Sequence, residues 1–203
     1  MQDVALEACC LINLCAAGVI LRPSASSPAK ARRSTKASAR ATSHPGFGLN
    51  LHIPSRVTAE TLYIMQPDEE DQTKLVKQPV DLQGYIAAGL LAPCDFQDEA
   101  EIELFVQMAA QLGDGEAACF AIAKQRGWVL ATDDRCARRF AADAALAVIT
   151  TPELVKLWAE TTQASDEEIA AVLRNIQRFA YFTPRANSPE YAWWISCLSE
   201  DAK

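Results

Sequence analysis

Short apolar runs alternate with helical patterns in the second half of the chain, and this alternation restricts the fold more than any other feature. The spacing predicts helices over Asp114–Arg126 and Asp133–Ala142, and strands over Trp128–Ala131 and Leu146–Ile149. Strands that alternate with helices form a mostly parallel sheet with helices on both faces. The expected fold class is therefore α/β.

The first ordered segment is also strand followed by helix. Val4–Leu6 predicts a buried strand, and Ala8–Gly18 predicts the helix after it. Residues 4–21 are almost continuously apolar, but an acidic residue precedes the run and Glu7 and Asn13 interrupt it, which is unlike a signal peptide or a membrane anchor. We therefore expect no membrane association.

The charge of the chain is distributed unevenly. The net charge of the 203 residues is −7, which argues against a general coat for nucleic acid. The stretch 22–48 nevertheless contains six basic residues and no acid, and it has almost no large apolar side chain. We expect a flexible basic insertion there. A solvated linker is favoured over an arm that follows a phosphate backbone, because no aromatic residues lie between the charges.

Cysteine and histidine offer little catalytic chemistry. The seven cysteines lie in apolar contexts and form no C-x-x-C pair, which favours reduced thiols in a cytoplasmic protein. Two histidines supply few ligands for imidazole-based metal or triad chemistry.

Acidic residues stand where strands end and helices begin. The candidates are Glu7 after the first strand, Glu60 on a helix predicted to start at Pro54 and Ser55, Asp114 and Glu116 in a Gly-Asp-Gly-Glu block, and Asp133 with Asp134 after the strand Trp128–Ala131. Several of them could simply cap helices. Gathered into one pocket, however, the carboxylates would repel one another unless a hard cation such as Mg²⁺ or Mn²⁺ joined them. The sequence therefore predicts an acid-lined metal site.

Four segments resemble the PIN-domain ribonucleases, and together they span Val4 to Glu160 apart from the insertion. They are the strand-acid-helix segment Leu6–Leu14, the segment Val57–Leu62 with Glu60, the block Leu112–Ala117, and the run Leu130–Arg135. The last two together are fairly specific, and they resemble a toxin-like subgroup with a Gly-Glu block as its third acidic motif. The first two alone would be weak.

The resemblance implies a PIN-like three-layer sandwich and Mg²⁺- or Mn²⁺-dependent hydrolysis of RNA phosphodiester bonds. It implies catalytic roles for Glu7, Glu60, Glu116 and Asp134, with Asp133 as the alternative to Asp134 among the metal ligands. Thr132 and Asn13 are expected to support these ligands, although an ordinary polar helix position explains Asn13 equally well. Arg135, Arg138 and Arg139 are expected to hold RNA phosphates or, equally, to form a solvated helix face.

The resemblance also has consequences for partners and domains. Many members are toxins of bacterial toxin–antitoxin pairs, so an antitoxin protein is an expected partner. Separately from the resemblance, the aromatic group Tyr191–Ile195 would, if exposed, suit a homodimer or a partner groove. We expect a PIN-like domain over residues 1–160, followed by a helical and aromatic tail over 161–203. The family normally has Asp where this chain has Glu7. This departure leaves an alternative function, a catalytically weakened PIN-like module for protein interaction.

Overall fold

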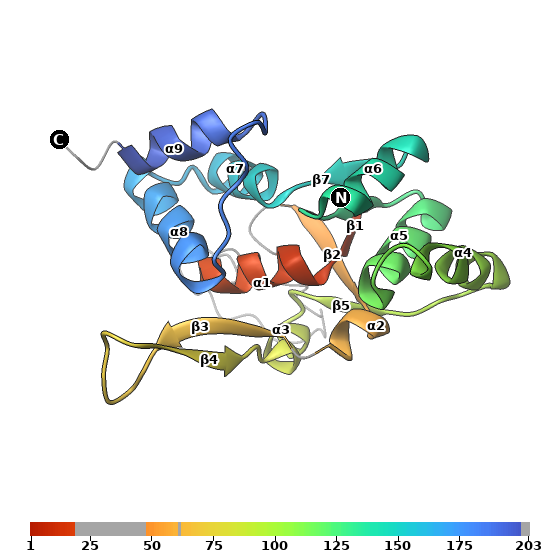
Figure 1. Cartoon of the computed structure of the whole chain (residues 1–203), viewed down its shortest axis with the longest axis horizontal. Coiled ribbons are helices and arrows are strands. Elements are labelled where there is room, and N and C mark those ends of the chain that lie inside the picture. Colours follow the sequence, from red (N-terminus) through yellow and green to blue (C-terminus); the bar gives the residue numbers. More distant parts are fainter. Residues whose placement is uncertain (19–47, 61, 200–203) are drawn as a thin grey trace, which may run out of the picture.

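A five-stranded parallel sheet forms the centre of the molecule (Figure 1). The computed structural model describes residues 1–18, 48–60 and 62–199. The strand order is β5-β2-β1-β6-β7, and every neighbouring pair is parallel. The strands are β1 (Gln2–Leu6), β2 (Leu49–Pro54), β5 (Ala92–Cys94), β6 (Val129–Ala131) and β7 (Val148–Ile149). The predicted α/β class with a mostly parallel sheet is confirmed.

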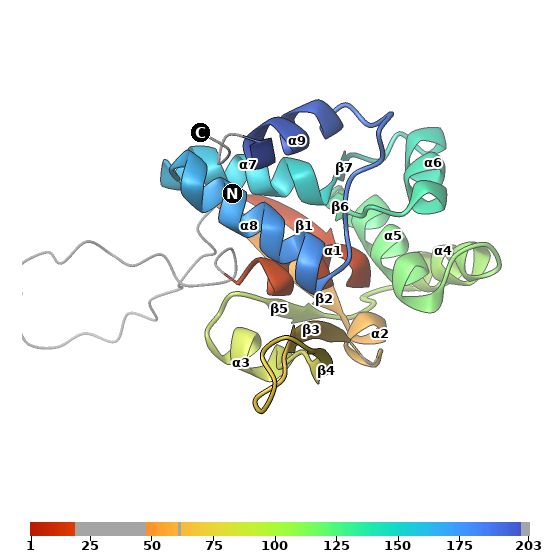
Figure 2. The same ribbon diagram turned by 60° about the vertical axis from the view of Figure 1, so that its left-hand side comes forward.

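Helices cover both faces of this sheet, as the two views in Figures 1 and 2 show. One side carries α1 (Ala8–Ala17), α7 (Thr151–Thr162) and α8 (Asp166–Phe179). The other carries α4 (Glu99–Ala109) and α5 (Asp114–Arg126), with α6 (Arg135–Asp143) beside them. The short helices α2 (Ser55–Thr58) and α3 (Leu82–Ala87) connect β2 to β5. Within the described ranges, none of these helices has the length and apolar character needed to cross a bilayer.

The central strands are buried because both of their faces are covered. Val4, Ala5 and Leu6 of β1 are at most 1% exposed, and Leu130 and Ala131 of β6 are equally buried. Continuous apolar strands of this kind are typical of parallel sheets between helical layers. Their burial fixes the carboxyl ends of β1 and β6 side by side, with Leu6 paired to Ala131.

The segment after β2 differs from the prediction. The helix expected to carry Glu60 ends at Thr58, and the chain then forms an antiparallel hairpin of β3 (Tyr63–Pro67) and β4 (Leu75–Pro79). The hairpin lies at the side of the molecule opposite α9 (Figures 1 and 2). The helix does begin at the predicted start signals Pro54 and Ser55, but it stops after one turn because the chain that follows pairs as the β3–β4 hairpin.

The carboxyl-terminal segment packs on the rest of the fold. Helix α8 contacts α1, and α9 (Tyr191–Ser199) contacts α8. Trp194 of α9 is fully buried within the hydrophobic core. Its ring meets that of Phe182 edge to face at 5.8 Å between centroids.

The predicted insertion 22–48 lies, except for Gly48, outside the described residues, and the domain division at residue 160 stays a prediction.

A buried ion pair fixes α4 against α5. Glu101 on α4 is 1% exposed, and its carboxylate accepts hydrogen bonds from Arg126 Nε at 2.6 Å and Arg126 Nη2 at 2.8 Å. Its Oε2 also accepts the backbone N–H of Gln97. The hydrogen bonds from Arg126 hold the pKa of the Glu101 carboxyl below its usual range. This pair therefore helps to orient α5, which carries the Gly-Asp-Gly-Glu block.

We predict that Glu101→Gln lowers the free energy of unfolding by roughly 3 kcal/mol at neutral pH, because it leaves the Arg126 charge without its partner. The pKa of folded Glu101 lies below the unfolded value of about 4.3, so the stabilisation is complete above that value and disappears as the pH falls through the folded pKa. Urea denaturation at several pH values measures both effects. Glu103→Gln, on the exposed side of α4, is the matched control. An equal loss in the control, or a constant loss down to low pH, would contradict the prediction.

Candidate active site

A cleft of about 770 Å³ opens at the carboxyl ends of the central strands. Four of the carboxylates that line it lie at strand ends or helix starts: Glu7 directly after β1, Glu116 in the first turn of α5, and Asp133 and Asp134 directly after β6. In open α/β sheets, this edge is where ligands bind. The fold thus brings into one cleft four of the five acids that the sequence singled out as catalytic or metal-binding.

Glu7 is the most constrained of these acids. Its backbone N–H donates to the carbonyl of Ala131 at 3.2 Å, which holds it beside β6. The residue is 2% exposed, and its Oε2 is buried with no hydrogen-bond partner. Burial, followed by the proximity of Cys9 and Glu116, raises the pKa of the Glu7 carboxyl to about 10, although a hydrogen bond with Thr132 opposes this. An isolated carboxylate in this position is costly, and a neighbouring cation would remove the cost.

Glu116 is half-buried at the start of α5. Its Oε2 accepts the backbone N–H of Gly113 at 3.1 Å, so one oxygen closes the helix amino terminus. Asp114, which the sequence offered as a helix cap, instead occupies the first helical position, and Gly113 is the cap. The Glu116 carboxylate lies close enough to Glu7 to raise the pKa of the latter.

Glu60 lies outside the residues that line the cleft and is exposed. Partial burial, together with the nearby carboxylates of Glu116 and Asp114, nevertheless raises the pKa of its side chain. A Cβ at Gly115 would overlap Glu60 Oε1 and press on Val57. The absence of a side chain at Gly115 therefore allows Glu60 to rest against the first turn of α5.

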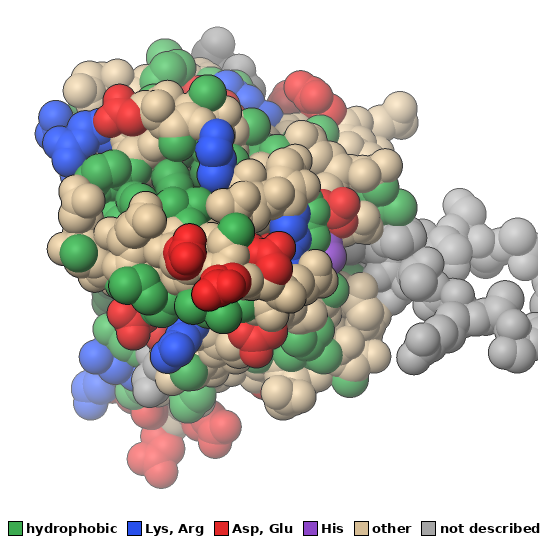
Figure 3. Space-filling view, turned by 90° about the vertical axis from the view of Figure 1, so that its right-hand side faces the viewer, with side chains coloured by type: hydrophobic (Ala, Val, Ile, Leu, Met, Phe, Trp, Pro, Cys, Tyr) green, Lys and Arg blue, Asp and Glu red, His purple; other side chains and the backbone are tan. Residues whose placement is uncertain are grey.

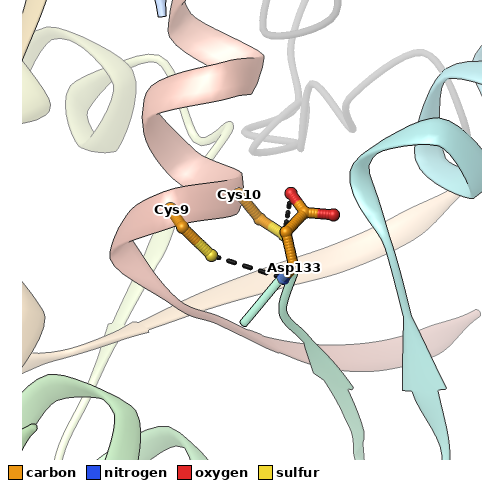
Figure 4. Close-up of side chains that lie close together, drawn as sticks. All are labelled: Cys9, Cys10 and Asp133. Atoms are coloured by element: carbon orange, nitrogen blue, oxygen red, sulfur yellow. Dashed lines mark hydrogen bonds between the residues drawn. The ribbon is translucent and has the colours of Figure 1, made fainter. Parts of the chain in front are cut away.

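Asp133 is held by four donors from other parts of the chain. Its Oδ2 accepts from Asn13 Nδ2 at 3.0 Å, Thr151 Oγ1 at 2.5 Å and Cys10 Sγ at 3.4 Å, and its Oδ1 accepts the Thr151 backbone N–H at 2.9 Å. The backbone N–H of Asp133 in turn points to Cys9 Sγ (Figure 4). The structure places the predicted supporting residue Asn13 in direct contact with a cleft carboxylate.

Asp134 has a different environment. Its Oδ1 accepts the backbone N–H of Ala137 at 2.8 Å and so caps α6. Its own N–H donates to Thr132 Oγ1 at 3.0 Å. Thr132 is fully buried and thus connects the Glu7 and Asp134 sides of the cleft. The second carboxylate oxygen of Asp134 has no assigned hydrogen bond among the described residues and is free to accept a ligand.

The three predicted arginines of α6 also line the cleft. Arg135, Arg138 and Arg139 are exposed, and their guanidinium groups stand beside the acids rather than in ion pairs with them in the described part of the chain. Figure 3 shows the face formed by α4, α5 and α6, where acidic and basic side chains are interspersed. This surface is not the continuous basic patch of a non-specific nucleic-acid coat.

Two groups of cleft residues were missed by the sequence reasoning. Thr150, Pro152 and Cys9 line the cleft, and so do residues 182–190 apart from Ala186. No local motif distinguishes the segment 182–190, which the packing of α8 and α9 brings to the cleft. The pairing of Thr151 with Asp133 likewise depends on β6 and β7 being neighbours.

The donor atoms of the cleft fit a hard divalent cation. Glu7, Glu116 and Asp134 offer carboxylate oxygens, the ligands that Mg²⁺ and Mn²⁺ prefer. The sulfur atoms of Cys9 and Cys10 and an oxygen of Asp133 also lie within 4.8 Å of one another, a softer donor set. Cys10 is fully buried, and burial raises the pKa of its thiol well above the usual value, which opposes thiolate coordination. The unpartnered Oε2 of Glu7 therefore favours the all-oxygen set.

Comparison with known proteins identifies the family of the chain. A family model of the PIN domain matches residues 49–187. The chain therefore belongs to the PIN-domain family. PIN domains are typically nucleases that use divalent metals. Searches among curated proteins and among solved structures gave no significant match.

We predict that Asn13→Ala lowers the free energy of unfolding by about 2 kcal/mol, because Asp133 loses a buried charge-assisted donor. Asn13 also donates to Thr151 Oγ1 at 3.0 Å, so both partners are affected. Chemical denaturation measures the change. Asn187→Ala, at an exposed position, is the control and should leave the stability within about 0.5 kcal/mol. If Asn13→Ala lowers the free energy of unfolding by less than about 0.5 kcal/mol, Asp133 does not depend on this contact.

Proposed function

We propose that the protein is a divalent-metal-dependent endoribonuclease that hydrolyses RNA phosphodiester bonds. The observation that carries the proposal is the buried, unpartnered Oε2 of Glu7, which shares a cleft with Glu116, Asp133 and Asp134. Membership of the PIN-domain family supports the class of reaction. The arginines of α6 at the rim support a phosphate-bearing substrate.

In this proposal Glu7, Glu116 and Asp134 hold Mg²⁺ or Mn²⁺, and Asp133 is the alternative to Asp134. When bound, the cation supplies Lewis-acid polarisation of the scissile phosphate and a more acidic water. Asn13 and Thr151 keep Asp133 oriented, and Thr132 does the same for the Glu7 and Asp134 sides of the cleft. Glu60, at the edge beside Glu116, orients water or completes the cation site.

The substrate is held by the cationic rim. Arg135, Arg138 and Arg139 follow one another along exposed positions of α6, within the lining of the same cleft. Their guanidinium groups can donate to phosphate oxygens on either side of the scissile bond. The carboxylates beneath them repel that same backbone, which limits productive binding to the cation-loaded cleft.

A role as the toxin of a toxin–antitoxin pair with an antitoxin partner stays a prediction from the resemblance, and a homodimer stays a prediction from the aromatic group Tyr191–Ile195. A catalytically weakened interaction module is the second candidate function. The residue that favours it is Glu7, whose extra methylene relative to Asp moves the carboxylate outward in a fully packed position.

We predict metal-dependent cleavage of single-stranded RNA by the purified chain in Mn²⁺ or Mg²⁺, with complete loss on chelation. Glu116→Gln and Asp134→Asn each remove a ligand and should lower the cleavage rate by more than about 100-fold. Asp133→Asn, measured in parallel, identifies which of the adjacent acids matters more. The matched control is Asp143→Asn at the exposed end of α6, which should leave the rate unchanged. Cleavage that survives both chelation and the ligand substitutions would reject the metal mechanism.

A second prediction concerns Glu7 itself. Calorimetric titration with Mn²⁺ should show binding to the native chain and at least about tenfold weaker binding to Glu7→Gln, because the buried oxygen donor is then neutral. Glu7→Asp should retain binding. An inactive native chain whose cleavage appears in Glu7→Asp would establish the interaction module in place of the nuclease.

A further inference from the structure

The connection between α8 and α9 forms another part of the cleft lining. Residues 182–190 of this connection line the cleft, apart from Ala186, and they include Arg185, Asn187 and Ser188. Arg185 is exposed, and its side chain forms no assigned hydrogen bond or ion pair within the described residues. Arginines therefore reach the lining of the acidic cleft both from α6 and from the α8–α9 connection.

The connection is held in place at both ends. On the α8 side, Gln177 Nε2 donates to Thr183 Oγ1 at 3.1 Å, and Pro184 is buried. On the α9 side, Trp194 is fully buried in the core. A turn closes the middle, where the Ser188 backbone N–H donates to the Arg185 carbonyl at 2.8 Å. Arg185 is thus presented from a fixed backbone rather than from a free tail.

Ser188 supplies an independent observation. Its Oγ is buried, has no hydrogen-bond partner and belongs to a residue that lines the cleft. A buried hydroxyl without a partner costs free energy, and rotation of the Ser188 side chain toward the cleft that it lines would let a ligand oxygen recover this cost. Arg185 and Ser188 therefore offer a charge and a neutral donor from the same turn.

We propose that the α8–α9 connection is the second wall of an RNA-binding groove, in which Arg185 and Ser188 bind the phosphodiester backbone across from the arginines of α6. The inference rests on the proposed function. It places the RNA strand, which α6 and the acids would hold, in a path between two walls. Glu190, at the far end of the connection, sets the limit of this path, since its carboxylate repels phosphate. Arg185 and Ser188 are positioning residues for the substrate, and neither takes part in bond cleavage.

The test measures binding of a short fluorescein-labelled single-stranded RNA to the full chain by anisotropy, in Ca²⁺ and over a series of salt concentrations, with intact RNA verified on a gel. Arg185→Gln should weaken binding about fivefold and reduce the slope of log K against log salt by about 0.7, the value for one lost phosphate contact on a single strand. Ser188→Ala should weaken binding without changing the slope, because the hydroxyl is neutral. Arg178→Gln on α8, exposed and outside the cleft, is the matched charge control and should change neither quantity.

Thermal unfolding of each variant separates a binding loss from a folding loss, and native-like midpoints are expected for all three. The proposal is overturned if Arg185→Gln binds like the native chain, if Arg178→Gln has the same effect, or if the native chain does not bind the RNA. A native chain whose binding depends on Arg185 but that fails to cleave RNA in Mg²⁺ or Mn²⁺ would reject the proposed function and leave the groove established.

Discussion

The burial of the Glu7 carboxylate at the end of the central strand is the constraint on which the site depends. β1 lies in the middle of the sheet, paired on both sides, so the residue after it cannot turn to solvent without leaving the Ala131 carbonyl unpaired. The carboxylate is therefore held beside Glu116 and next to the strand end that carries Asp133 and Asp134. Like charges so placed either take up protons or share a cation.

The surrounding contacts make this arrangement rigid. The Glu101–Arg126 pair joins α4 to α5 and thereby fixes the helix that presents Glu116. Asn13 and Thr151 reach Asp133 from α1 and α7, which lie on the other side of the sheet from α5. The cleft is thus supported from both helical layers, and its rim is completed by α6 and by the connection between α8 and α9. Preorganised donors of this kind cost no reorganisation when substrate binds.

Much of this could be predicted from local pattern. The strands with their following acids, and the helix that ends at Gly127, follow from apolar runs and cap residues, and they gave the α/β class and four of the cleft carboxylates. The β3–β4 hairpin escaped prediction because its stability comes from a partner strand rather than from its own residues. Thr151, Cys9 and Arg185 were not predicted as cleft residues for a related reason. Each reaches the cleft through packing between distant segments, and the sequence around each residue does not indicate that packing. Glu60 was expected on a helix and lies beyond its end, yet still beside Glu116.

The most direct test of the central claim is a crystal structure of the native chain soaked in Mn²⁺, with anomalous diffraction recorded near the manganese edge. The account predicts an anomalous peak in contact with the Glu7 oxygen that has no hydrogen-bond partner, and with oxygens of Glu116 and either Asp134 or Asp133. A peak held only by the Cys9 and Cys10 sulfur atoms, or a Glu7 carboxyl that remains without a cation while manganese binds elsewhere, would contradict it.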